Sequence, residues 1–210
     1  DTYNADAAFV GDDGSPFNEF EGLEGDDEIF GNGDTLISYT RATGGVIVDF
    51  VQGSAQGIAG DAGVGVDSFS GVSSVNGSQF DDILLGSDSD AFENFRGLGG
   101  DDQIFAGDGN DRVLGGDGDD EISGQAGNDF LEGGLGSDVL LGGDGFDFAS
   151  FADRSDTGFT FFMSGALTAQ AKIGGEIDTL ISIDAVVGSR LADTYNADAA
   201  FVGDDGSPFN

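Results

Sequence analysis

The chain has 210 residues, and its 41 Asp and Glu against 6 Lys and Arg give a formal net charge of −35, which makes nucleic acid and anionic membranes poor partners. Its 33 Asp and 39 Gly disfavour helices, and the absence of Cys and His excludes zinc fingers, haem sites, thiol enzymes and histidine-dependent triads. The 19 Phe and 38% hydrophobic residues nevertheless suffice for a folded core, and no apolar run is long enough for membrane insertion.

The first 18 residues, DTYNADAAFVGDDGSPFN, recur without change as residues 193–210, which fixes a period of 192 residues. An identity of this length is not chance. We therefore interpret the chain as one unit of a tandem array, with residues 193–210 as the start of the next repeat.

A smaller repeat lies inside this unit. Residues 17–30, FNEFEGLEGDDEIF, match residues 92–105, FENFRGLGGDDQIF, at 9 of 14 positions, and residues 67–84 resemble residues 178–195 at a constant offset of 111. Each unit thus resembles two diverged copies of a module that alternates a Gly/Asp-rich tract with a β-rich tract. We expect residues 1–35 to be the first, partial Gly/Asp tract.

Two β-rich segments, residues 36–80 and 151–192, separate the Gly/Asp-rich tracts. Both contain apolar alternation, as in GVIVDF at residues 45–50 and GFTFFM at residues 158–163, which predicts strands. We expect these spacers to continue the stack as wider, calcium-poor coils. A small separate β-sandwich in each segment is the alternative.

The tract at residues 81–150 contains the finest repeat, which has a period of nine. From Gly97 to Ser150 the chain reads GLGGDDQIF, AGDGNDRVL, GGDGDDEIS, GQAGNDFLE, GGLGSDVLL and GGDGFDFAS. Position four is always Gly, position eight is always apolar, and position six is always Asp. The template is G-G-x-G-x-D-x-U-x, where U is an apolar residue.

This spacing predicts one turn and one short strand per block. The x-U-x segment forms a three-residue strand, the six preceding residues form a Gly-rich turn, and two blocks make one coil of eighteen residues. Successive coils stack as parallel strands about 4.8 Å apart around a thin apolar interior. The predicted fold is therefore all-β, a parallel β-roll or β-solenoid.

The position-six aspartates would then form two ladders, one on each edge of the stack. Two carboxylates about 5 Å apart repel by ~0.8 kcal/mol in bulk water and by ~3 kcal/mol at an effective dielectric near 20. The only basic residue in the six blocks is Arg112, so the ladders require bound cations. Carboxylate and carbonyl oxygens favour Ca²⁺, whereas Mg²⁺ demands stricter octahedral geometry. The ladders are Asp102, Asp120 and Asp138 on one edge and Asp111, Asp129 and Asp147 on the other.

Six nonapeptides in phase resemble the calcium-binding parallel β-roll of repeats-in-toxin (RTX) proteins. This resemblance implies that Ca²⁺ is bound by aspartate carboxylates and by carbonyls of the glycine turns, and it implies export by type I secretion to the exterior or surface of a bacterial cell. The implied metal ligands are Asp102, Asp111, Asp120, Asp129, Asp138 and Asp147, together with Gly100, Gly109, Gly118, Gly127, Gly136 and Gly145.

Asp27 in GLEGDDEIF and Asp82 in FDDILLG are further implied ligands, in partial blocks. Three residues depart from the template: Ala106 replaces Gly at position one, and Leu98 and Gln125 replace Gly at position two. The block after Phe30 is two residues short, so Asp34 does not align with the ladder.

Three functional interpretations are open. The favoured one is a calcium-stabilised structural repeat of a large secreted or cell-surface protein, such as an adhesin stalk, an extracellular filament or a surface-layer component. The second is a calcium-dependent secretion and folding module of an exported enzyme or toxin. The third, a ligand site or enzyme in the spacers, has no supporting residues, so we predict no catalytic activity. The expected partners are calcium ions and neighbouring copies of the repeat, in the same chain or by self-association.

Overall fold

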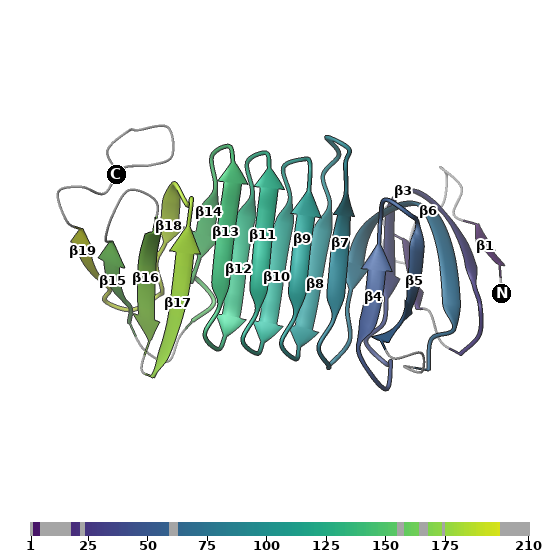
Figure 1. Cartoon of the computed structure of the whole chain (residues 1–210), viewed down its shortest axis with the longest axis horizontal. Helices are drawn as coiled ribbons and strands as arrows, with labels where there is room; N and C mark the ends of the chain where they lie inside the picture. The colour runs from purple at the N-terminus through teal and green to yellow at the C-terminus, as the bar shows by residue number, and fades with distance from the viewer. Residues whose placement is uncertain are drawn as a thin grey trace.

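The computed structural model describes residues 2–4, 18–21, 24–58, 63–154, 158–163, 168–173 and 175–197. Its regular elements in this part of the chain are strands, and all nineteen of them join one continuous sheet. The strands stack along the long axis of the molecule, with β1 near one end and β19 near the other (Figure 1). The described residues include no helix that could cross a membrane.

The centre of the stack is a roll of parallel strands. Its strands are β7 (Ile83–Ser87), β8 (Asn94–Gly99), β9 (Gln103–Gly107), β10 (Arg112–Asp117), β11 (Glu121–Ala126), β12 (Phe130–Leu135), β13 (Val139–Asp144) and β14 (Phe148–Ser150). Even-numbered and odd-numbered strands form two separate ladders. Val113 pairs with Leu131 and Ile122 pairs with Leu140, which confirms the predicted coil of eighteen residues.

The strands are longer than the sequence predicts. β10 to β13 have six residues each and extend through positions one to three of the following block. Gly116 pairs with Gly134, so the backbone ladder continues where there are no side chains to pack. The prediction of a three-residue strand was wrong because it was based on the single apolar residue of each block. It did not consider pairing between backbone groups of the glycines.

The segments on either side of the roll belong to the same sheet. They are β1 (Thr2–Asn4), β2 (Asn18–Glu21), β3 (Glu28–Ser38), β4 (Val46–Asp49), β5 (Ser54–Gly57) and β6 (Val66–Asn76) before it, and β15 (Thr160–Met163), β16 (Thr168–Ile173), β17 (Glu176–Ile181), β18 (Ala185–Val187) and β19 (Thr194–Ala197) after it. β3 pairs with β6, and β13 pairs with β17, both in parallel. The strands of both spacers therefore continue the sheet of the roll, as the interpretation of the spacers as wide coils requires.

Each wide coil contains an antiparallel excursion. β4, β5 and β6 pair antiparallel in sequence, and β15, β16 and β17 do the same. Parallel pairing resumes after each excursion, between β4 and β7 and between β15 and β19. The two spacers thus share one topology, as the sequence similarity at an offset of 111 indicates.

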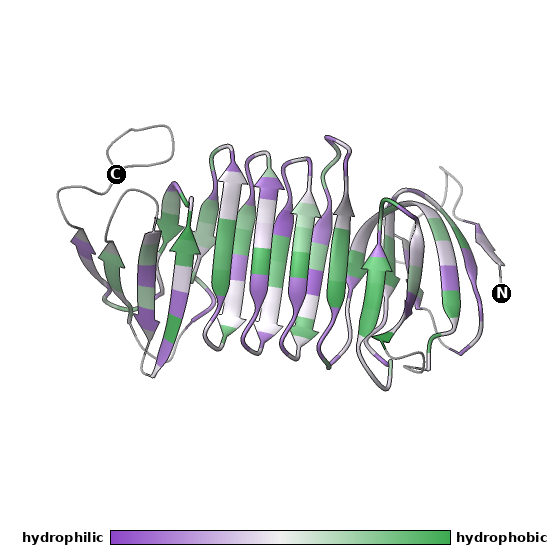
Figure 2. Cartoon of the chain, in the orientation of Figure 1, coloured by the Kyte–Doolittle hydropathy of each residue, from purple (hydrophilic) through white to green (hydrophobic). Residues whose placement is uncertain are grey.

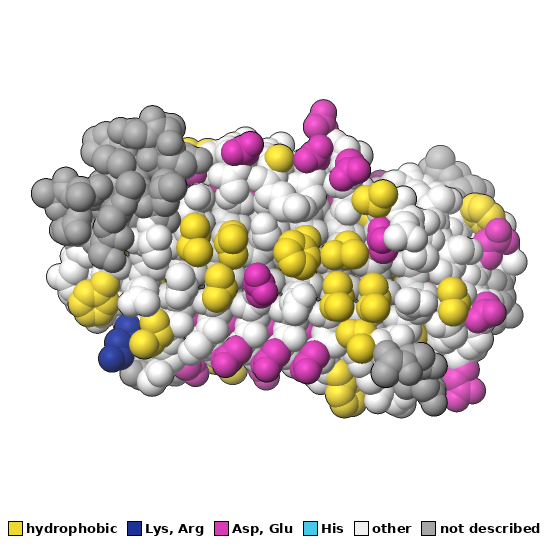
Figure 3. Space-filling view, in the orientation of Figure 1, with side chains coloured by type: hydrophobic (Ala, Val, Ile, Leu, Met, Phe, Trp, Pro, Cys, Tyr) yellow, Lys and Arg dark blue, Asp and Glu magenta, His cyan; other side chains and the backbone are white. Residues whose placement is uncertain are grey.

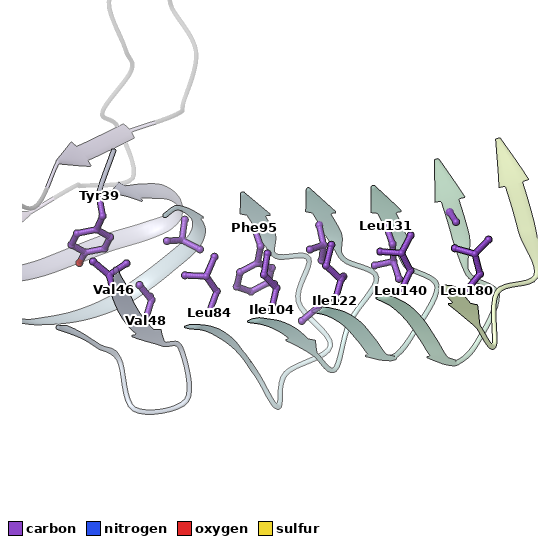
Figure 4. Close-up of a cluster of buried hydrophobic side chains, with 14 of the residues drawn as sticks. Tyr39, Val46, Val48, Leu84, Phe95, Ile104, Ile122, Leu131, Leu140 and Leu180 are labelled. Carbon is purple, nitrogen blue, oxygen red and sulfur yellow. The ribbon is translucent and has the colours of Figure 1, made fainter. Parts of the chain in front are cut away.

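One row of apolar side chains fills the interior. Position-eight residues such as Ile104, Ile122 and Leu140 are fully buried, and the row continues into the wide coils through Val48 and Leu180 (Figure 4). Figure 2 shows hydrophobic bands on successive strands of the stack. This row fixes the height of each coil and so fixes where each turn begins.

The turns depend on left-handed backbone conformations. All six position-four glycines have positive φ, between 108° and 139°. Position two is left-handed as well, and the two residues that depart from the template there, Leu98 and Gln125, adopt φ of 84° and 74°. These substitutions keep the turn and place a side chain in a conformation that normally favours glycine.

Candidate metal centre

The position-six aspartates lie where each turn ends and the next strand begins. The strand register places Asp102, Asp120 and Asp138 in one line and Asp111, Asp129 and Asp147 in another. All six side chains are buried, with at most 2% of their surface exposed. The structure therefore brings together the two predicted ladders, and it buries them.

One oxygen of each carboxylate is held by the backbone of the preceding coil. The amide of Asp102 donates to Oδ1 of Asp120 (2.9 Å), and the amide of Asp120 donates to Oδ1 of Asp138 (3.0 Å). On the other edge, the amide of Asp111 donates to Oδ1 of Asp129 (2.8 Å). Each aspartate thus links its own coil to both neighbouring coils, because its amide donates to one neighbour while its carboxylate accepts from the other.

The second oxygen has no such donor. Among the described residues, Oδ2 is buried and without a hydrogen-bond partner in Asp102, Asp111, Asp120, Asp129 and Asp138. A buried carboxylate oxygen without a donor carries a desolvation cost that only a proton or a cation can offset. A regular series of such atoms fits a row of cation sites or of protonated carboxyls.

Position-one glycines let the neighbouring Oδ2 atoms pack closely against the backbone. A Cβ placed on Gly115 would overlap Oδ2 of Asp120 and would lie 2.6 Å from the carbonyl oxygen of Gly133. Gly97 stands in the same relation to Asp102 and to the carbonyl of Gly115, at 2.7 Å. At each of these two glycines a carboxylate oxygen and a backbone carbonyl oxygen from the next coil therefore lie close together. These hard oxygen donors fit Ca²⁺.

Ala106 fills the equivalent position in the block of Asp111. This residue is buried and lies in β9 without disrupting the stack. The fold therefore tolerates a methyl group at position one, and the block of Asp111 differs from the neighbouring blocks in carrying one.

The position-four glycines, predicted as carbonyl ligands, follow the same turn edge. The carbonyl oxygen of Gly100 lies directly against the Cα of Gly118, and that of Gly109 lies against Gly127. The carbonyl oxygen of Gly118 lies in the same way against Gly136, and that of Gly127 against Gly145. Their carbonyls thus point along the stack, and their part in calcium ligation stays a prediction.

Position-five side chains form a second, exposed ladder that runs in the opposite direction. The amide of Asp119 donates to Oδ1 of Asp101 (2.9 Å), and the amide of Asn128 donates to Oδ1 of Asn110 (2.8 Å). In Figure 3 acidic side chains follow the edge of the stack, below a band of hydrophobic side chains. Because their Oδ1 atoms already accept hydrogen bonds at the surface, these residues stabilise the turns.

The two predicted ligands in partial blocks differ from each other. Asp27 is buried, and its amide donates to Oδ1 of Asp67 (3.0 Å), as in the roll. Asp82 instead accepts from the amide of Val46 (2.7 Å) and from both the amide (2.6 Å) and the hydroxyl (2.8 Å) of Ser78. Both oxygens of Asp82 therefore carry protein donors, and this carboxylate caps the ladder.

The structure adds ladder residues that the sequence interpretation missed. Asp178 accepts from the amide of Asp138 (3.0 Å), and its buried Oδ2 has no hydrogen-bond partner in the described part of the chain. Glu93 donates its amide to Oδ1 of Asp111 (2.8 Å). The signal was present, because the internal repeat at offset 111 begins at Asp67 and Asp178, each two residues before an apolar position.

Thr35 takes the ladder position beside Asp34. The register of β3 on β6 aligns Leu36 with Ser74 and aligns Ile37 with the apolar row, so Thr35 is buried while Asp34 is exposed. The short block after Phe30 thus shifts the acid out of the ladder, which agrees with its predicted misalignment.

Burial raises the pKa of the ladder carboxyls. Desolvation is the main cause, and it raises the pKa of Asp102 and of Asp120 to about 8 and that of Asp111 to about 7, with repulsion from neighbouring acids adding to it. The backbone hydrogen bonds to Oδ1 oppose this shift. Without a cation, the buried ladder therefore favours protonated carboxyls.

Acidic side chains alone do not form a metal-binding site here. No group of three or more acidic side chains converges as a metal site within the described ranges. A cation held beside Oδ2 would therefore take one carboxylate from the ladder and most of its other ligands from backbone carbonyl oxygens.

The family model of the RTX calcium-binding nonapeptide repeat (4 copies) matches residues 17–35, 89–122 and 114–149. A comparison with curated proteins finds no match. The chain therefore carries RTX calcium-binding repeats, which confirms the resemblance, and the matched segments cover less than half of it. Asp27 and the six position-six aspartates of the roll fall inside these segments.

Replacing one position-one glycine by alanine tests the site. Gly115→Ala places a methyl against Oδ2 of Asp120, and we expect the protein to fold in calcium, as Ala106 shows is possible, but to bind one calcium ion fewer at saturation. Gly99→Ala is the matched control, because its Cβ would meet no atom closer than 3.7 Å. Isothermal titration calorimetry gives both stoichiometries. Equal stoichiometry in the two variants contradicts the assigned position of the ion.

The raised pKa values predict how pH acts on the metal-free chain. Between about pH 4 and pH 8 the unfolded chain releases protons that folded Asp102 and Asp120 retain, so the free energy of unfolding must fall as pH rises. Calcium affinity should rise over the same range, because the ion binds the deprotonated carboxylate. Circular dichroism in chelator at several pH values gives the folded fraction of the metal-free chain, and calcium titrations at the same pH values give the affinity. A metal-free stability that increases with pH in this range would refute the assignment.

Proposed function

We propose that this chain is a calcium-stabilised structural repeat of a large secreted or cell-surface protein, such as an adhesin stalk, an extracellular filament or a surface-layer component. The observation that carries the proposal is the series of buried Oδ2 atoms without hydrogen-bond donors in the described roll. These atoms stand at a regular spacing along a stack that has one core and one direction of growth. Proteins with RTX calcium-binding repeats are typically secreted, which supports the location.

The mechanism we propose is folding coupled to ion binding. At low calcium, the net charge of −35 and the buried carboxylates oppose folding, so the chain stays expanded and can be exported. Calcium, when bound, supplies the positive charge that balances the negative charge of these carboxylates. The aspartate amides then close successive coils through Oδ1, and the apolar row is buried with them.

The tandem repeat favours a structural role over the alternative of a secretion and folding module for an exported enzyme or toxin. The unchanged recurrence of residues 1–18 after 192 residues implies copies in series, which suits the generation of length. The complete gene distinguishes the two. Many consecutive units support a stalk or filament, whereas a few units beside a catalytic domain support the module. We propose no catalytic role for the unit itself.

A calcium titration of the 210-residue chain tests the proposal. We expect a cooperative gain of β signal by circular dichroism, which Asp120→Ala shifts to at least about tenfold higher calcium because it breaks the link between three coils. Asp117→Ala removes the same charge from an exposed position and should leave the midpoint nearly unchanged. Full folding in excess chelator at neutral pH, or equal shifts in the two variants, would count against ion-coupled folding.

A further inference from the structure

The same tyrosine-containing strand occurs at both ends of the stack. Residues 2–4 and 194–196 have the identical sequence Thr-Tyr-Asn. At one end, β1 pairs in parallel with β3, so that Tyr3 lies opposite Ile29. At the other end, β19 pairs in parallel with β15, so that Tyr195 lies opposite Phe161. One strand sequence is therefore seen once against the coil that follows it and once against the coil that precedes it.

Inside the unit, β7 makes both of these pairings at once. Leu84 lies opposite Val48 of β4 on one side and opposite Ile104 of β9 on the other. The internal repeat relates Leu84 to Tyr195, and it relates Ile104 to Ile29. At the junction between the first spacer and the roll, one strand therefore makes both pairings. At the ends of the chain, β1 makes one of these pairings and β19 makes the other.

The hydrogen bonds around the two strands agree in detail. The amide of Val46 donates to Oδ1 of Asp82 (2.7 Å), and the amide of Phe159 donates to Oδ1 of Asp193 (2.9 Å). The corresponding serine hydroxyls donate to the same two oxygens at 2.8 Å, from Ser78 and Ser189. The preceding side of β19 is thus already built like that of β7.

The following side of β7 shows what a next unit would add. There the amide of Asp82 donates to Oδ1 of Asp102 (2.7 Å), and the amide of Gln103 donates to the carbonyl of Asp82 (2.9 Å). The internal repeat relates Asp102 and Gln103 to Asp27 and Glu28. A following copy therefore offers Asp193 the same acceptor and the same donor.

The exposure of Tyr195 indicates that β19 has an open edge. Leu84 is fully buried in β7, whereas Tyr195 is 51% exposed although its ring stacks on Phe161 at 4.9 Å between centroids. In β1 the ring of Tyr3 contacts Phe20 at 5.2 Å. One tyrosine in the junction would make both contacts.

We propose that consecutive 192-residue units form one uninterrupted solenoid, in which the strand Thr194–Ala197 of each unit lies between β15 of that unit and β3 of the next. The partner of this open edge is a second copy of the same chain, joined to it in sequence. The proposal rests on the tandem array of the proposed function, and it adds that the units have no hinge between them. The aspartate ladder then continues from Asp193 into Asp27 of the following unit.

A protein of two consecutive units tests the junction. In calcium, electron microscopy should show straight particles about twice as long as single units, because stacked repeats extend along one axis. Tyr195→Asp at the junction should produce particles bent at the midpoint over a broad range of angles. Leu191→Asp is the matched control: it adds the same charge at a nearby residue that is 46% exposed, and its particles should stay straight.

The outcomes separate this inference from the proposed function. Freely bent wild-type particles made of two folded halves would overturn the junction and leave the calcium-dependent unit intact. Straight particles in all three proteins would also overturn it, because the tyrosine would then not join the units. If calcium fails to fold even the single unit, the proposed function itself fails.

Discussion

The whole structure depends on one asymmetry within each ladder carboxylate. Oδ1 accepts a backbone amide from the preceding coil, while the buried Oδ2 of residues such as Asp120 has no donor in the described part of the chain. The first interaction sets the spacing of the coils. The second makes that spacing unfavourable until a cation is present. In the folding mechanism that we propose, such a stack is stable where calcium is available, which suits a protein that must be unfolded in one place and rigid in another.

The roll and the wide coils both contain linked aspartates, but the number of residues between two linked aspartates differs. In the roll, every eighteenth residue continues a ladder, and the apolar row needs only one side chain per strand. In the wide coils, the linked aspartates are forty residues apart, as from Asp138 to Asp178, and an antiparallel excursion fills the interval. Apolar and aromatic packing is richer there, for example between Phe151, Phe159 and Phe161. The apolar core thus runs through both kinds of coil, whereas on one edge the aspartate ladder continues to Asp178 and ends at Asp82.

The roll could be predicted from the sequence because its period is rigid. A Gly at position four, an Asp at position six and an apolar residue at position eight leave one coil length and one ladder partner. The rest depended on contacts that no local pattern encodes. Asp178 was missed because forty residues of chain separate it from its partner Asp138. The capping role of Asp82 was missed because its hydrogen-bond donors come from Val46 and Ser78, which lie outside the nonapeptide blocks. The length of the strands was missed because glycines pair through the backbone and leave no apolar signal.

The most direct measurement of the central claim is anomalous X-ray diffraction from crystals of the chain grown in millimolar calcium. The account predicts anomalous peaks beside Oδ2 of Asp102 and Asp120, within bonding distance of the carbonyls of Gly115 and Gly133. Ladder side chains turned out to solvent, or spaces beside Oδ2 without anomalous density at this calcium concentration, would contradict it.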